Sequence, residues 1–214
     1  YAMRTSWAEM EANWYDAMDM MAWASGGAAD PQGDCDDTPS ATARLAGQGW
    51  VSWDITELVR QWVSSERSNE GLLIANADPP SIWHTPYVRF EAYARENVGN
   101  PALQPKLIIN WSSPPTATPT PTPTDTATPT PTATPTSRYS PTATSTHDVQ
   151  AHAIQAGEDT YLDSLGPATI HGAEGVLGLR TDGYRTMYPL LRFDLSAIPS
   201  SAVVRQATMS LWVS

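Results

Sequence analysis

The sequence predicts an all-β protein, an antiparallel β-sandwich of the jelly-roll type with one short amphipathic helix. Three observations lead to this prediction. Most apolar runs are short and alternate with polar residues, as in strands with one buried face. Glycine, proline and asparagine interrupt these runs about every 8–12 residues, a spacing typical of sandwiches. Only one segment has the apolar spacing of a helix.

That helix is predicted to begin at Asp54, before three turns of amphipathic sequence. Asp54 is a suitable N-cap, and Glu57 three residues later can complete a capping box. The apolar residues recur every three or four positions: Ile55, Leu58, Val59, Trp62 and Val63. Around the helix, residues 71–75, 87–93 and 106–111 are predicted to be strands.

The last third of the chain is predicted to contain three further strands, at residues 159–162, 188–195 and 207–214. In the last of these, Ala207, Met209, Leu211 and Val213 share one face, because side chains alternate along a strand. Gly166-Pro167 and Ile198-Pro199 supply turns between the strands.

A linker rich in proline and threonine is predicted at residues 113–147. Nine of the 19 prolines lie between Pro114 and Pro141. Such a run favours solvated, disordered polyproline II structure, since proline removes the N–H donors that helices and central strands need. Its threonines suit O-glycosylation, so we expect a secreted or cell-surface protein. The chain opens at Tyr1 without an apolar leader, and we expect any signal peptide to lie upstream of this fragment.

The charge excludes some classes of partner. The formal net charge is −11, which argues against binding nucleic acid or an anionic membrane surface, because both require clustered Lys and Arg. No apolar stretch approaches the ~20 residues of a membrane-spanning helix, so we expect no membrane insertion. Cys35 is the only cysteine in this chain. Either its thiol is unpaired and lies in a polar loop, or its disulfide partner lies in sequence outside this chain.

Several segments together carry a family resemblance. They are Trp7-Ala8-Glu9, Trp50 to Thr56 and Arg95-Glu96-Asn97 before the linker, and Asp159-Thr160-Tyr161-Leu162 and Leu190 to Leu195 after it. This combination resembles the DNRLRE domain, which overlaps carbohydrate-binding module family 96. The resemblance implies secreted, multi-domain proteins built on β-sandwiches, some of which bind acidic polysaccharides such as alginate.

The resemblance also implies a domain organisation. Residues 1–112 match the C-terminal part of one such β-sandwich, and residues 148–214 match the N-terminal part of a second. Half a sandwich exposes an apolar face and unpaired strand edges. We therefore formed the hypothesis that the strands after the linker fold back and complete the first sandwich within this chain, since closing a long loop costs little additional entropy.

A carbohydrate site is predicted at Trp83, His84, Tyr87 and Arg89, which follow Pro79-Pro80-Ser81 and lead into a strand. Aromatic rings stack on the C–H faces of sugars, and nearby polar groups bind the hydroxyls. The alternative is that Trp83 packs in the interior. The acidic charge fits alginate poorly, so a neutral glycan, or none, is easier to reconcile with this chain.

A calcium site is the one cofactor hypothesis. The loop at residues 30–37 carries Asp30, Asp34, Asp36 and Asp37, and Ca²⁺ accepts six to eight oxygen ligands from flexible loops. The spacing is not that of an EF-hand, and a solvated acidic loop is the alternative interpretation. No other cofactor is expected.

The sequence predicts a protein that is not an enzyme. It contains no Gly-x-Ser-x-Gly, phosphate-loop or His-Glu-x-x-His motif. Glu9 and Glu11 would share one face of a strand, but two carboxylates alone are weak grounds for glycosidase chemistry. Two functions from different classes remain: a module that binds polysaccharide or a cell-surface glycan beside further domains of the same protein, and a structural or adhesion spacer without a glycan ligand.

Overall fold

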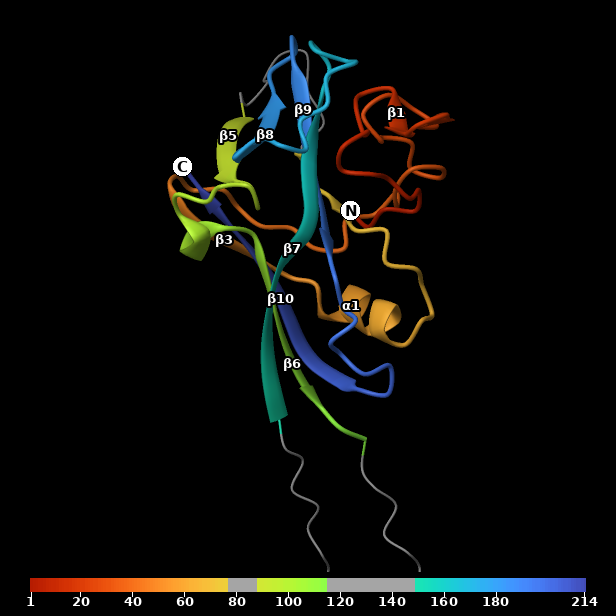
Figure 1. Ribbon diagram of the computed structural model, residues 1–214, viewed down its shortest axis with the longest axis vertical. Coiled ribbons are helices and arrows are strands. Elements are labelled where there is room, and N and C mark those ends of the chain that lie inside the picture. The colour runs from red at the N-terminus through yellow and green to blue at the C-terminus, as the bar shows by residue number, and fades with distance from the viewer. Residues whose placement is uncertain (77–87, 115–148) are drawn as a thin grey trace, which may run out of the picture.

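The computed structural model describes residues 1–76, 88–114 and 149–214 (Figure 1). Within these ranges the chain is mainly β-strand, which confirms the predicted all-β fold. The linker prediction falls almost entirely outside the described residues. No helix in these ranges is long and apolar enough to cross a membrane.

The elements in chain order are β1 (Asp16–Met18), β2 (Met21–Ala22), β3 (Gly49–Asp54), α1 (Thr56–Val63), β4 (Leu72–Leu73), β5 (Val88–Tyr93), the 3-10 helix η1 (Pro101–Leu103), β6 (Lys106–Ser112), β7 (Val149–Asp163), β8 (Val176–Thr181), β9 (Thr186–Phe193) and β10 (Val203–Val213).

One antiparallel sheet forms most of the molecule. Its strands lie in the order β3-β10-β5-β8-β9-β7-β6, and β4 pairs with β9. An additional pairing joins β10 to β6, so six strands form a closed, barrel-like ring around the interior. The small β1–β2 hairpin belongs to the N-terminal loops, which lie beside β9 in Figure 1. Closure reduces the number of exposed sheet edges, which would otherwise pair with other chains.

Strands from before and after the linker pair with one another. β6 pairs with β7 over residues 106–112 and 149–155, β3 pairs with β10 over residues 49–54 and 208–213, and β5 pairs with β8. These partners are far apart in the chain and adjacent in Figure 1. The hypothesis that the later strands fold back onto the earlier ones is therefore confirmed within this chain.

Two long strands change partners along their length. β7 pairs with β6 through its first half and with β9 through its second, with an irregularity in register between Ala156 and Glu158. β10 has a similar irregularity between Val204 and Gln206. A bulge increases the local twist and bends the strand. Figure 1 shows β7 running from the lower arm into the upper part of the molecule.

The single helix differs slightly from the prediction. α1 begins at Thr56, with Ile55 rather than Asp54 in the N-cap position. Asp54 Oδ1 still accepts a hydrogen bond from the N–H of Thr56, at 3.0 Å. Glu57 does not complete a capping box, because its carboxylate pairs with Arg60 at 3.3 Å. The apolar face of α1 is buried against β10, as its spacing predicts.

The interior is built jointly by both parts of the chain. One buried cluster combines the helix with residues of the large sheet, among them Val59, Leu107, Leu191 and Phe193. A second cluster holds the N-terminal loops against the sheet through residues that include Met3, Trp7, Cys35, Leu162 and Leu190. Cys35 is thus a buried thiol rather than part of an exposed polar loop, and burial raises its pKa. Each of the two clusters contains residues from both parts of the chain.

Candidate functional site

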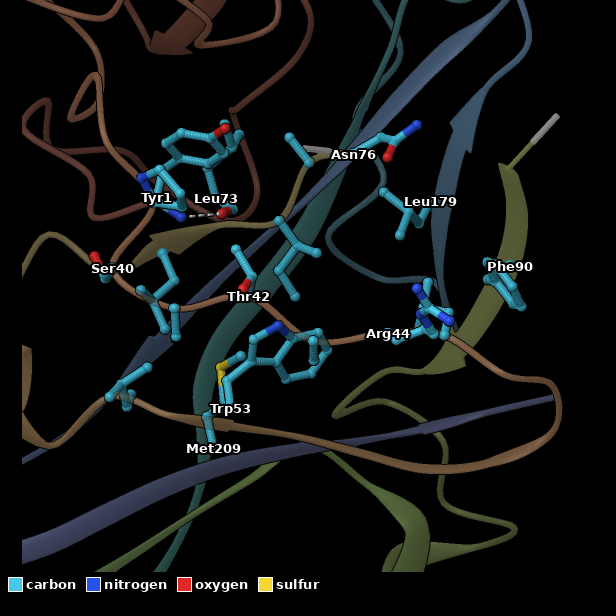
Figure 2. Close-up of a pocket in the computed structure, with 18 residues that line it drawn as sticks. Tyr1, Ser40, Thr42, Arg44, Trp53, Leu73, Asn76, Phe90, Leu179 and Met209 are labelled. Atoms are coloured by element: carbon cyan, nitrogen blue, oxygen red, sulfur yellow. Dashed lines mark hydrogen bonds between the residues drawn. The ribbon is translucent and has the colours of Figure 1, made fainter. Parts of the chain in front are cut away.

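A cavity of about 460 Å³ opens into the interior between the sheet and the loop at residues 39–45. Figure 2 shows the ring of Trp53 inside it, with Met209 below, Arg44 and Phe90 at one end, and Tyr1 and Leu73 at the other. Pockets that bind small ligands usually measure about 300–1,000 Å³. The remaining lining residues are Pro39, Ser40, Ala41, Thr42, Ala43, Leu45, Ile55, Leu72, Ile74, Ala75, Asn76 and Leu179.

The alternation of side chains along two strands explains which residues face the cavity. In β3, Trp53 lies opposite Met209 of β10 and points inward, whereas Trp50 and Ser52 point to the outer face. In β5, Phe90 lines the cavity. Its neighbour Arg89 is therefore on the other face of the strand.

The cavity has apolar walls and polar groups near its ends. The backbone nitrogen of Tyr1 donates a hydrogen bond to the carbonyl oxygen of Leu73, at 2.9 Å. Arg44 is exposed, and within the described ranges its guanidinium makes no hydrogen bond or ion pair. A cation beside half-buried aromatic rings is available to donate hydrogen bonds to a ligand.

The predicted carbohydrate site is only partly covered by the structure. Trp83, His84 and Tyr87 lie outside the described residues. Asn76 and Phe90, which precede and follow that segment in the sequence, both line the cavity. Arg89 is exposed, and its guanidinium lies 3.5 Å from the carboxylate of Glu91. Arg89 lies on the face of β5 away from the cavity, and carbohydrate binding at Trp83, His84, Tyr87 and Arg89 stays a prediction.

The acidic loop uses two of its carboxylates to organise its own backbone. Asp34 is only 1% exposed and accepts hydrogen bonds from the N–H groups of Ala24, Ser25 and Asp30, at 2.8–3.2 Å. Asp30 accepts hydrogen bonds from Gly33 and Gln32, and these hold its pKa below the ordinary value. Carboxylates satisfied in this way hold the loop in shape without an added ion.

The other two carboxylates of the loop differ from each other. Asp36 pairs with Arg67 at 2.5 Å and with Arg4 at 2.8 Å. Asp37 is exposed and accepts a hydrogen bond from Thr38. Calcium at Asp30, Asp34, Asp36 and Asp37 stays a prediction, although arginines and backbone N–H groups contact three of the four.

Replacing Asp36 with asparagine is expected to lower the free energy of unfolding at pH 7 by about 1 kcal/mol. Burial alone would raise the pKa of Asp36, but hydrogen bonds from Arg67 and Arg4 outweigh burial and hold it below the ordinary value. A lowered pKa contributes stability above the unfolded pKa of about 3.9, and that contribution disappears as the pH falls through the folded pKa. Urea unfolding should therefore show a smaller difference between Asp36→Asn and the natural sequence at pH 3 than at pH 7. Asp37→Asn is the control, with little effect at either pH.

Three other carboxylates, from distant parts of the sequence, meet around Arg95. Its guanidinium Nη2 lies 2.6 Å from Glu9 and 2.7 Å from Glu96. Its backbone N–H donates to Asp159 Oδ2 at 2.8 Å, and the N–H of Asp159 donates to Glu9 Oε1 at 2.8 Å. Burial raises the pKa of Asp159 well above its ordinary range, and the neighbouring carboxylates of Glu96 and Glu9 raise it further. In the described ranges, this is the group of acidic side chains whose spacing could hold a metal ion.

The prediction that Glu9 and Glu11 share one face of a strand is wrong. Residues 8–12 form a turn rather than a strand, so the two side chains do not share a strand face. Glu9 accepts a hydrogen bond from Arg95, whereas Glu11 accepts one from the N–H of Asp19, at 2.7 Å. The two carboxylates have separate structural roles.

A pair of tryptophans lies on the outer face of the sheet, and no pattern in the sequence predicted their contact. Trp50 and Trp212 lie opposite each other on β3 and β10, with ring centroids 5.7 Å apart and an interplanar angle of 80°. The ammonium of Lys106 lies 3.8 Å from the centroid of the Trp50 ring. Ser52 and Ser210 continue the same face, 2.8 Å apart. The alternating pattern of residues 207–214 placed Trp212 on this face, but nothing local indicated its partner.

The chain was compared with known proteins in three ways. No protein-family model matches it. No curated protein matches it, and neither does any solved structure. The resemblance to the DNRLRE domain thus stays a prediction that rests on the quoted residues.

Proposed function

We propose that this chain is a non-catalytic, secreted or cell-surface module that binds a polysaccharide in the cavity around Trp53. The observation that carries the proposal is a cavity of about 460 Å³ in which aromatic rings and an unpaired cation are combined. The resemblance to the DNRLRE domain supports the same class of ligand, and the Pro/Thr-rich residues 113–147 support a place outside the cell.

The chemistry of the lining suits a sugar ring. A pyranose has C–H faces that stack on aromatic rings and hydroxyl groups that need hydrogen-bond partners. Trp53 and Phe90 offer the rings, and Arg44, Ser40 and Thr42 offer polar groups near the opening. The mixture of apolar wall and a few polar groups is typical of small-ligand sites.

The charge of the chain favours a neutral glycan over an acidic one. With a net charge of −11, the protein repels a polyanion such as alginate at long range. Among the described residues that line the cavity, Arg44 is the only one with a positively charged side chain. A guanidinium carries five N–H donors, which serve sugar hydroxyls as well as carboxylates.

Replacing Arg44 with alanine is expected to weaken binding to the preferred glycan about tenfold or more, because hydrogen bonds from a charged donor are lost. The melting temperature should stay unchanged, since Arg44 has no partner in the described structure. Binding is measured first on an array of neutral and acidic glycans and then by calorimetry with the best oligosaccharide.

Arg205→Ala is the matched control, because Arg205 is also exposed but does not line the cavity. It should retain full affinity. Trp83→Ala tests in the same assay whether that residue contributes to binding. If the folded natural chain binds no glycan on the array, the proposal fails, and a structural or adhesion spacer becomes the better interpretation.

A further inference from the structure

Glu9, Glu96 and Asp159 come from three segments that meet only in the folded chain. Glu9 lies in the turn at residues 8–12, Glu96 follows β5, and Asp159 lies in β7. One ligand atom from each lies within 4.8 Å of the other two. This arrangement joins the part of the chain before the linker to the part after it.

The charges around these carboxylates do not balance. Within the described structure, Arg95 is the cation that pairs with this group, through Glu9 and Glu96. Three carboxylates thus face one guanidinium. Asp159 is 1% exposed, and the Glu9 side chain is 10% exposed. Excess negative charge in such a position is costly unless a cation or a proton offsets it.

Two oxygen atoms in the group are buried without a donor. Within the described ranges, no N–H or O–H group donates to Asp159 Oδ1 or Glu96 Oε2, whereas the other oxygen of each carboxylate is contacted by Arg95. A buried acceptor without a partner normally costs about 1–3 kcal/mol. Since Arg95 already contacts both side chains, these atoms are free to accept an ion without breaking the existing contacts.

We propose that Glu9, Glu96 and Asp159 bind a calcium ion that ties the turn at residues 8–12 and the end of β5 to β7. Ca²⁺ accepts oxygen ligands in flexible arrangements, as these carboxylates provide. Mg²⁺ retains several of its waters and needs a regular octahedron, which suits a buried group of three carboxylates less well. The ion would compensate the charge that Arg95 leaves unbalanced.

The proposal is tested by calorimetry and thermal unfolding of the whole chain, first treated with EDTA and then titrated with CaCl₂. We expect one Ca²⁺ per chain, with a dissociation constant on the order of 10⁻⁴–10⁻³ M, as in other extracellular modules. At saturating Ca²⁺ the melting temperature should rise by about 5 °C. The same concentration of MgCl₂ should give a much smaller rise, and an equal rise would overturn the assignment to calcium.

Asp159→Asn and Glu96→Gln should abolish the heat of binding and the rise in melting temperature. In EDTA both variants should melt at or above the temperature of the natural chain, because each removes one carboxyl group from a crowded, buried cluster of acids. A variant that no longer responds to Ca²⁺ but keeps its melting temperature in EDTA has lost the ion and not the fold. The double variant Asp30→Asn/Asp37→Asn is the control, and it should respond to Ca²⁺ as the natural chain does.

Two results would overturn the proposal. In the first, the natural chain shows neither heat nor a rise in melting temperature at 10 mM CaCl₂, which would leave a proton shared between Asp159 and Glu96 as the means of balancing the charge. In the second, the response persists in Asp159→Asn and Glu96→Gln but is lost in the Asp30→Asn/Asp37→Asn control, which would place the ion in the acidic loop.

Discussion

Cleavage of the chain at a protease site introduced within residues 115–148 is expected to leave its two parts bound to each other. The strands on either side of the cut pair along β6 and β7, along β3 and β10, and along β5 and β8. Both buried clusters also contain residues from both parts. The cut product should elute from a sizing column as one species and separate into two bands only on a denaturing gel.

Each part made alone is expected to lack a cooperative unfolding transition, because its strands have lost their partners and its apolar face is exposed. After cutting, the melting temperature should depend on protein concentration, since folding has become an association of two chains. Leu107→Asp in the cut protein is the control. It places a charge in a fully buried position of β6 and should release the two parts. Separation of the unmodified parts, each still folded, would contradict the shared fold and favour two independent modules.

Replacing Gly71 with alanine is expected to lower the free energy of unfolding by about 3 kcal/mol or more. Gly71 has a φ of +88°, a conformation that residues with a Cβ adopt at a cost. An added Cβ would also lie 2.4 Å from the carbonyl oxygen of Leu191, which is backbone and cannot move aside easily. This close approach places β4 beside β9, so the substitution strains a contact between the two parts of the chain.

The variant Gly183→Ala separates the cost of a positive φ from the cost of the steric clash. Gly183 has a similar φ of +80°, but nothing lies within 4 Å of an added Cβ. It should therefore show only the conformational cost, about 1–2 kcal/mol. Urea unfolding of both variants measures the difference. Equal losses of stability would mean that the approach of Gly71 to Leu191 contributes nothing.

The strand predictions succeeded where the apolar alternation is strong. Residues 106–111 and 188–195 match β6 and β9 closely. The first half of β7 was missed because residues 149–155 contain only two large apolar side chains, Val149 and Ile154, and most of the seven are exposed. β8 was missed as well, since Gly178 interrupts its pattern. The side chain of Met187 occupies the space that a Cβ at Gly178 would need.

The candidate sites were less predictable than the strands. The acidic loop was visible as a cluster of aspartates, but Arg67, which contacts Asp36, lies 31 residues away. The cavity beside Trp53 depends on how the loop at residues 39–45 lies against the sheet. A local pattern carries no information about contacts of this kind.

The sequence alone determined the all-β class, the position of the helix and most of the strands, because these depend on the spacing of apolar residues over a few positions. Only the tertiary structure decided which strands pair, and hence that the residues before and after the linker build one interior. It also decided that Glu9 meets Arg95, 86 residues later, and Asp159, 150 residues later. Contacts at such separations follow from the closure of the whole sheet, which no short segment encodes.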